Sequence, residues 1–255
     1  MLDQFLIQIT PFGRERKVRV YLPVGYDDTT EAYPVLYMHD GQNLYRDADA
    51  SFGTSWGIAD HLDQTARGLI VVGIDCSQEG FGRLNEYSPW VNPTVGQELL
   101  GVNEPFGGEG GAYIDWIVRE LKPFIDEKYR TIADDTAMAG SSMGGLISTY
   151  AACAYPHIFR RVAAVSSAYW FSQAELEGLI RQSDLSPVER FYMDVGTCEG
   201  DSAEGRARYV QSSQAVYDLL KTKAQQVRFT IAEGAQHNEA AWRRRFPAIL
   251  QFMYD

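Results

Sequence analysis

Short apolar runs alternate with stretches of helical periodicity along most of the chain. Residues 34–38 and 69–74 are continuously apolar, which is typical of strands buried on both faces of a parallel sheet. Further strands are predicted at 136–139, 162–165, 191–195 and 227–231. Helices are predicted at 58–66, 113–125, 146–155, after a capping box at Ser172 and Glu175, at 209–220 and at 242–253. This alternation predicts an α/β fold with a mostly parallel sheet covered by helices on both faces.

Two segments depart from this alternation. Residues 5–9 and 17–22 look like two strands joined by a turn at Pro11-Phe12-Gly13, so we expect an antiparallel N-terminal start. Residues 76–111 are rich in Gly, Pro and Asn and lack a clear period, which is typical of a functional loop or lid. Since no repeat or linker interrupts the pattern, we predict one domain over residues 1–255 with a cap or loop insertion at about 76–111.

A glycine-flanked serine connects a predicted strand to a predicted helix. Residues 140–144 read Gly-Ser-Ser-Met-Gly, and of the two serines only Ser142 has glycine two positions away on each side. A nucleophile elbow requires this context, because the tight turn lifts the hydroxyl out of the sheet and aims the N–H groups of the helix at the reacting carbonyl. We predict Ser142 as a nucleophile; the alternative is a plain Gly/Ser-rich loop.

A serine nucleophile needs a histidine base, and two histidines follow Ser142. On folds that carry a serine in this context, the acid and then the histidine come later in the chain. His157 falls at the end of the helix after the elbow, away from the carboxyl edge of the sheet, whereas His237 lies in a loop at that edge. We therefore predict His237 as the general base, although a lone loop histidine often has no function.

The carboxylate that orients the base should lie near the end of the strand at 191–195. Asp194 falls inside this strand, where alternation fixes it within the sheet. Glu199 lies just past the strand end, where it can reach the Nδ1–H of a histidine, and Asp201 is the second candidate. We predict Glu199 as the acid; a solvated acidic turn is the alternative interpretation.

Backbone N–H groups should stabilise the oxyanion that forms when a serine attacks a carbonyl. One donor is expected in the loop at 39–43, where Gly41 permits a turn that leaves an N–H free, and Met143 N–H is expected to supply the other. His39 and Asp40 precede the nucleophile, so we interpret them as hydrogen-bonding residues that shape this loop.

Charge and composition exclude several classes of partner. The net charge of −11 argues against nucleic acid or an anionic membrane. The three cysteines and four histidines lack the spacing of metal ligands, so we expect no metal and no cofactor. The odd number of cysteines predicts reduced thiols in a cytoplasmic protein. We expect no signal peptide, because the N-terminus has no basic segment, and no membrane span.

These motifs together resemble a known family. Arg19-Val20-Tyr21-Leu22-Pro23, residues 33–45, the elbow at 140–145 and Gly234-Ala235-Gln236-His237 with Trp242 are similar to the putative-esterase family of α/β-hydrolases. This family is related to S-formylglutathione hydrolase (esterase D), feruloyl and acetyl-xylan esterases, siderophore esterases and mycolyltransferases. The resemblance covers nearly the whole chain. It implies the α/β-hydrolase fold, with Ser142 as nucleophile, His237 as base and Glu199 as acid.

The resemblance also implies Gln42 N–H and Met143 N–H as the oxyanion donors. The expected reaction is hydrolysis of a carboxylic ester through an acyl-enzyme. An acyltransferase with the same residues, or a catalytically inactive hydrolase-fold binding protein, are the alternatives.

Six aromatic residues are expected near the mouth of the site, for an aromatic or sugar-containing ester, unless they belong to the core: Trp56, Tyr87, Trp90, Tyr169, Trp170 and Phe171. The expected partner is a small-molecule ester. The sequence leaves open which ester this is and whether the chain forms a homodimer.

Overall fold

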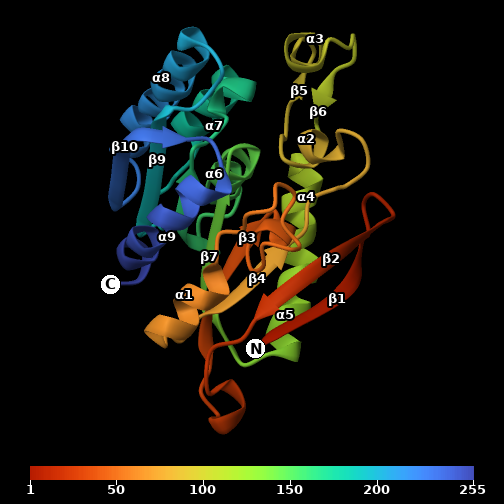
Figure 1. Ribbon diagram of the computed structural model, residues 1–255, viewed down its shortest axis with the longest axis vertical. Coiled ribbons are helices and arrows are strands. Elements are labelled where there is room, and N and C mark those ends of the chain that lie inside the picture. The colour runs from red at the N-terminus through yellow and green to blue at the C-terminus, as the bar shows by residue number, and fades with distance from the viewer.

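The computed structural model describes residues 1–255, except for the side chains of Leu99 and Leu100. The described backbone forms an eight-stranded sheet in the order β1-β2-β4-β3-β7-β8-β9-β10 (Figure 1). Its strands are β1 (Leu2–Ile9), β2 (Arg14–Tyr21), β3 (Tyr33–His39), β4 (Ile70–Ile74), β7 (Thr131–Ser141), β8 (Phe159–Val165), β9 (Arg190–Cys198) and β10 (Gln226–Gln236). Strand β2 is antiparallel to β1 and β4, and the strands from β4 to β10 are mutually parallel. The predicted fold class, with its antiparallel start, is confirmed.

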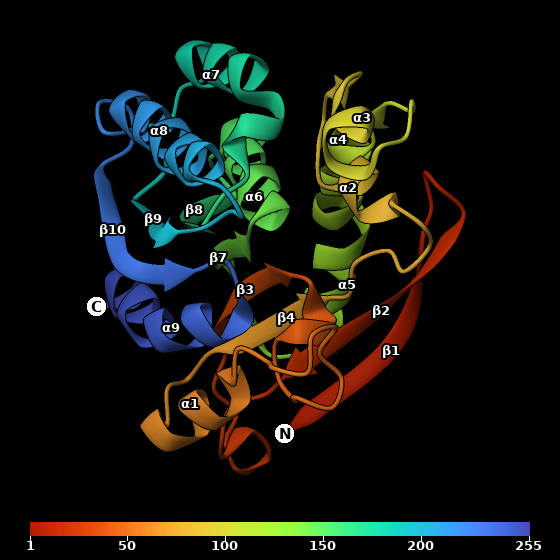
Figure 2. The same ribbon diagram turned by 45° about the horizontal axis from the view of Figure 1, so that its top comes forward.

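Helices cover both faces of this sheet. They are α1 (Ile58–Thr65), α2 (Gly82–Glu86), α3 (Val95–Leu100), α4 (Gly110–Trp116), α5 (Lys122–Lys128), α6 (Met143–Ala154), α7 (Gln173–Gln182), α8 (Ala203–Leu220) and α9 (Glu239–Tyr254). Shorter elements are the 3₁₀ helices η1 (Tyr26–Asp28), η2 (Gly41–Asn43) and η4 (Tyr169–Ser172), and the π-helical segment η3 (Ile117–Leu121) between α4 and α5. Helices α1 and α9 lie on one face, and α6 lies on the other (Figure 2). Alternate residues of β3 show why: Val35 and Tyr37 share a core with α6, whereas Leu36 and Met38 share a second core with α9. Within the described chain, no helix combines the length and the apolar character needed to cross a membrane.

One helix begins differently from the sequence prediction. Helix α7 starts at Gln173 with Ser172 at its N-cap, but the Ser172 side chain makes no capping hydrogen bond. Its hydroxyl lies 3.3 Å from the hydroxyl of Ser88 instead. The predicted capping box is therefore wrong, because a contact with a distant loop takes up the hydroxyl that would have capped the helix.

The segment expected to be irregular, 76–111, contains several short elements. After α2 come β5 (Val91–Asn92), α3 and β6 (Phe106–Gly107), and β5 pairs antiparallel with β6. Elements β5, α3 and β6 lie next to one another at the top of the view in Figure 1. Helix α2 is fixed to β2 through Glu86, which is fully buried and accepts hydrogen bonds from Arg16 Nη1 at 2.7 Å and Nη2 at 2.8 Å. This buried ion pair holds Arg83, also on α2, over the carboxyl edge of the sheet.

Candidate active site

Ser142 lies at a strained turn between β7 and α6. Its φ is 58° and its ψ is −123°, a conformation that non-glycine residues rarely adopt. Gly140 permits the turn, because a Cβ there would lie 2.6 Å from the carbonyl carbon of Gly144. The Ser142 N–H donates to Val165 O and its carbonyl accepts from Ala168 N, both at 3.0 Å. These contacts hold the serine where the carboxyl ends of the parallel strands meet.

His237 and Glu199 are brought together by neighbouring parallel strands. Glu199 follows β9 and His237 follows β10, whose last paired residues are Cys198 and Gln236. His237 Nδ1 lies 3.1 Å from Glu199 Oε2, and the imidazole is 24% exposed while the carboxylate is fully buried. Asp201, the second candidate for the acid, is exposed on the loop beyond.

The Glu199 carboxylate is also held on the side away from the imidazole. Its Oε1 accepts hydrogen bonds from Ser166 Oγ and from Gly196 N. The same serine hydroxyl accepts from Trp242 Nε1 at 2.9 Å and from Arg245 Nη2 at 2.7 Å. Ser166 thus uses its one donor and both of its lone pairs. Sequence reasoning missed Ser166 and Arg245, because no local motif marks them.

Asp194 lies inside β9, whereas Glu199 follows the end of that strand. As predicted it is inside β9, and its Oδ2 is 2.9 Å from Arg245 Nε while its Oδ1 accepts from Ser166 N at 3.1 Å. Burial raises the pKa of Asp194 to about 6, against the opposing effect of the Arg245 charge. Asp194 therefore belongs to the support beneath the site, and Glu199 is the carboxylate that meets His237.

The two backbone N–H groups predicted as oxyanion donors lack an intramolecular acceptor. Within the described chain, neither Gln42 N–H nor Met143 N–H is bonded to a protein oxygen. The Gln42 side chain is fixed across the loop, since its Oε1 accepts from Cys76 N at 3.0 Å and its Nε2 lies 3.1 Å from Cys76 Sγ. Gly41 packs directly on β4, where a Cβ would come within 2.6 Å of the Gly73 carbonyl carbon. These contacts hold the loop that carries the Gln42 N–H against β4 and Cys76.

His39 and Asp40 shape this loop from below. The Asp40 backbone is left-handed, with φ 58°, and its carboxylate accepts from Arg83 Nε at 2.7 Å and Nη2 at 2.8 Å. Its N–H donates to the Tyr87 hydroxyl at 3.1 Å. His39 is buried with its Nδ1 3.2 Å from the Tyr113 hydroxyl, and burial lowers its pKa to about 4. His39 is therefore neutral near pH 7 and enclosed in the core.

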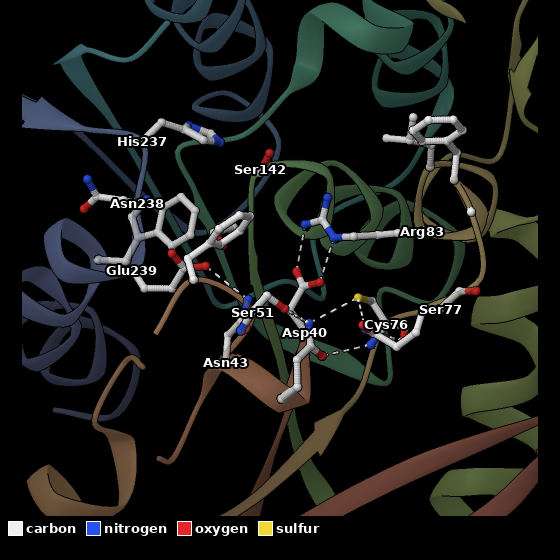
Figure 3. Close-up of a pocket in the computed structure, with 18 residues that line it drawn as sticks. Asp40, Asn43, Ser51, Cys76, Ser77, Arg83, Ser142, His237, Asn238 and Glu239 are labelled. Carbon is white, nitrogen blue, oxygen red and sulfur yellow. Dashed lines mark hydrogen bonds and ion pairs between the residues drawn. The ribbon is translucent and has the colours of Figure 1, made fainter. Parts of the chain in front are cut away.

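A cavity of about 760 Å³ opens beside Ser142 and His237. Figure 3 shows both side chains at its upper side, with Arg83 and Asp40 on one wall and Glu239 on another. Its lining combines polar and aromatic residues: Asp40, Gln42, Asn43, Ser51, Phe52, Cys76, Ser77, Gln78, Gly80, Phe81, Arg83, Leu84, Ser141, Ser142, His237, Asn238, Glu239 and Trp242. The volume suits a small-molecule ligand.

The aromatic residues expected at the mouth lie elsewhere. The cavity lining just given includes none of these six: Trp56, Tyr87, Trp90, Tyr169, Trp170 and Phe171. Tyr87 and Tyr169 are buried in the core, and Trp56 packs against Trp242 with ring centroids 5.7 Å apart. Trp170 packs under the Arg208 guanidinium, 4.6 Å from its ring centroid. Such large apolar rings are drawn into cores, and nothing local in the sequence distinguishes a ring that stays at a cavity.

Sequence analysis also missed the contact of Tyr209 with the imidazole. The Tyr209 ring centroid lies 4.9 Å from that of His237, and Trp242 packs edge-on against the imidazole at 5.1 Å. Burial raises the pKa of Tyr209, opposed by contacts of its hydroxyl with the side chains of Trp170 and Ser142. The predicted base is thus held between two aromatic rings. In the sequence Tyr209 is simply one position of an amphipathic helix.

These groups suit acyl transfer. They comprise the hydroxyl of Ser142 on a strained backbone turn, the His237 imidazole held by the buried Glu199 carboxylate, and two backbone N–H groups without an acceptor. Among the described side chains, no group of three or more His, Cys, Asp or Glu is arranged to hold a metal ion.

Comparisons with known proteins agree with the resemblance seen in the sequence. A family model described as Putative esterase matches residues 9–253. YbbA, an uncharacterized protein of Bacillus subtilis strain 168, is 28% identical over 246 residues, which cover 94% of this chain and 92% of YbbA. An IroE-like serine hydrolase from Shewanella oneidensis has a TM-score of 0.79 at 19% identity, covering 99% of this chain and 80% of that one. The siderophore hydrolase EstA from Aspergillus nidulans has a TM-score of 0.76 at 16% identity, with 98% and 93% covered.

The two structural likenesses show the hydrolase fold. The family match extends over nearly the whole chain. The chain therefore belongs to the putative esterase family, and ester hydrolysis is the activity that this membership supports.

Proposed function

We propose that this chain is a serine esterase that cleaves carboxylic esters through an acyl-enzyme intermediate. The observation that carries the proposal is the 3.1 Å contact between His237 Nδ1 and Glu199 Oε2 beside the cavity that Ser142 also lines. Because Nδ1 faces the carboxylate, Nε2 is the imidazole nitrogen left to accept the proton of the Ser142 hydroxyl. Glu199 fixes this tautomer and stabilises the imidazolium that forms.

The reaction then follows in two halves. Ser142 Oγ attacks the ester carbonyl, and the oxyanion of the tetrahedral intermediate accepts hydrogen bonds from Gln42 N–H and Met143 N–H. The intermediate collapses, the C–O bond to the alcohol breaks, and His237 returns its proton to the leaving oxygen. Water, deprotonated by His237, attacks the acyl-enzyme; the bond from the acyl carbon to Ser142 Oγ then breaks, and His237 returns the proton to Ser142 Oγ as the acid leaves.

The substrate we propose is a small-molecule ester. A cavity of about 760 Å³ accommodates a compound of that size. EstA, which shares the fold, is a siderophore hydrolase, and this favours a small-molecule substrate here as well. An acyltransferase would use the same residues, and an added alcohol acceptor would then appear in the product.

Four variants and one probe test the proposal. We expect Ser142→Ala and His237→Ala each to lower kcat toward p-nitrophenyl esters by roughly 10⁶-fold, and Glu199→Gln by roughly 10⁴-fold, as in comparable triads. Asp201→Asn is the control for the acid and should remain active. A fluorophosphonate probe should label the wild type and spare Ser142→Ala.

Turnover by Ser142→Ala at the wild-type rate would refute the nucleophile. If Asp201→Asn were inactive and Glu199→Gln active, the acid would be Asp201 and the rest of the mechanism would stand.

A further inference from the structure

A carboxylate that the proposed mechanism does not use faces the active-site cavity. Glu239, the first residue of α9, is 4% exposed and lines the cavity (Figure 3). Its Oε1 accepts a hydrogen bond from Asn43 Nδ2 at 3.1 Å. Among the described residues, the ion pairs of the chain include none with Glu239. The donors to this carboxylate are the Asn43 amide and its own backbone N–H, both neutral, so a buried charge remains without an ion-pair partner.

The rest of the cavity does not supply the missing positive charge. Arg83 lies on the opposite wall (Figure 3), but both Nε and Nη2 of its guanidinium are bonded to Asp40. These two charges offset each other, so Glu239 leaves the cavity with an excess negative charge. Burial raises the pKa of Glu239, against opposing effects of its own backbone N–H and of the more distant His237 and Arg83. The overall net charge of −11 adds to the attraction for a positive ligand.

Aromatic surface lies next to this carboxylate. Trp242 follows Glu239 by three positions on α9, so both side chains project from the same face of the helix, and both line the cavity. Phe52 belongs to another loop and follows Ser51, whose N–H donates to Asn43 Oδ1 at 2.9 Å, and Asn43 in turn bonds Glu239. The Phe52 ring is 81% exposed and also lines the cavity. A carboxylate bordered by aromatic faces is the arrangement that binds organic ammonium groups.

We infer that Glu239, Trp242 and Phe52 form a subsite for an alkylammonium group carried by the ester substrate. The inference rests on the proposed esterase function and names the substrate class of that site. The ammonium group would pair with Glu239 Oε2, while Oε1 keeps its bond to Asn43, and its alkyl groups would pack against the two rings. An uncharged hydroxyl would leave the charge of Glu239 uncompensated, so the cation is the better complement.

The test compares two esters that differ in one atom. Acetylcholine and 3,3-dimethylbutyl acetate have nearly the same shape, but only the former carries a positive charge. We expect the wild type to prefer acetylcholine in kcat/KM by about tenfold, the ratio that corresponds to ~1.4 kcal/mol. Glu239→Gln keeps an acceptor for Asn43 and should lower the ratio of the two kcat/KM values toward one.

Glu204→Gln is the matched control, since Glu204 is also an acidic residue in the first turn of a helix but is exposed on α8. It should keep the wild-type preference. A Glu239→Gln protein with the wild-type preference would overturn the subsite. A wild-type protein that prefers the neutral ester would overturn it too. The same holds if Glu239→Gln loses activity only toward hydroxylated esters such as glycerol acetate.

A binding measurement separates this inference from the esterase proposal. Tetramethylammonium chloride should bind Ser142→Ala protein in calorimetric titrations, and the added substitution Glu239→Gln should weaken that binding about tenfold, with sodium chloride as the blank. If this binding depends on Glu239 but the wild type hydrolyses no ester, the subsite is supported and the esterase proposal is refuted. Ester hydrolysis without such binding would refute the subsite alone.

Discussion

Replacing Ser166 with alanine tests whether the buried support of Glu199 matters to the site. The hydroxyl donates to Glu199 and accepts from Trp242 and Arg245, so its removal leaves three buried polar groups each short of one partner. Alanine is nearly isosteric and leaves the backbone in place. The substitution therefore removes hydrogen bonds and little else.

The magnitude follows from the groups involved. A neutral hydrogen bond contributes about 0.5–1.5 kcal/mol and one to a charged group about 1.5–3 kcal/mol. Since the three bonds share one atom and are not additive, we expect the free energy of unfolding of Ser166→Ala to fall by ~3–5 kcal/mol. For a chain of this size each 1 kcal/mol lowers Tm by roughly 2–4 °C, so the total is about 10 °C.

Catalysis should fall as well, because Glu199 would hold His237 less firmly. The loss in kcat should exceed tenfold and stay below the roughly 10⁴-fold that accompanies loss of a triad acid. Ser166→Gly is the comparator. Ser166 has a φ of 47°, and glycine relieves that strain at a gain of about 1 kcal/mol, so Ser166→Gly should be the more stable variant with the same kcat defect.

Urea unfolding monitored by circular dichroism gives the free energies, and p-nitrophenyl acetate hydrolysis gives kcat. A Ser166→Ala protein with wild-type stability and wild-type kcat would refute the support argument. A variant that loses stability at unchanged kcat would show that Glu199 is positioned without Ser166.

Three further predictions address other parts of the molecule. Burial lowers the pKa of His39 from 6.5 to about 4, so as the pH falls the unfolded chain binds this proton first, and folding stability is lost between pH 6.5 and 4. In urea unfolding, His39→Gln should reduce this loss of stability by about 3 kcal/mol. An unchanged pH dependence of the unfolding free energy would contradict a buried, neutral His39. Tyr209→Phe keeps the ring against His237 and should retain kcat within about tenfold, whereas Tyr209→Ala should lose clearly more; equal losses would show that the ring contact is unimportant. EDTA should leave the hydrolysis rate unchanged, and activity that returns only with a divalent ion would contradict a metal-free mechanism.

The parts of the site with a local signal could be predicted from the sequence. The Gly-x-Ser-x-Gly elbow depends on backbone geometry that only certain residues allow, so Ser142 stands out without any knowledge of its neighbours. Strand order and the carboxyl-edge rule then bring Glu199 and His237 to one place, and their contact at 3.1 Å follows from adjacent parallel strands. The α/β class was equally accessible, because parallel strands buried on both faces have a distinct pattern.

The rest depends on contacts between distant segments. Ser166 and Arg245 meet Glu199 only after β8, β9 and α9 have packed, and neither has a characteristic neighbour in the sequence. Glu239 and Asn43 are separated by 196 positions in the chain. None of the six predicted aromatic residues lines the cavity, for the same reason: whether a ring ends in the core or at the cavity is decided by packing and not by residue type.

The outer wall of the cavity differs in kind from its inner wall. Phe52 and Phe81 are 81% and 43% exposed and belong to short loops, whereas the Glu199 carboxylate and the Ser166 beneath it are buried. Substitutions at exposed loop positions usually change stability by less than about 0.5 kcal/mol. A directed-evolution library confined to Phe52, Gln78 and Phe81 could therefore search for new ester specificities with little loss of folded protein. In this chain, adaptation to a new substrate need not compete with the demands of folding.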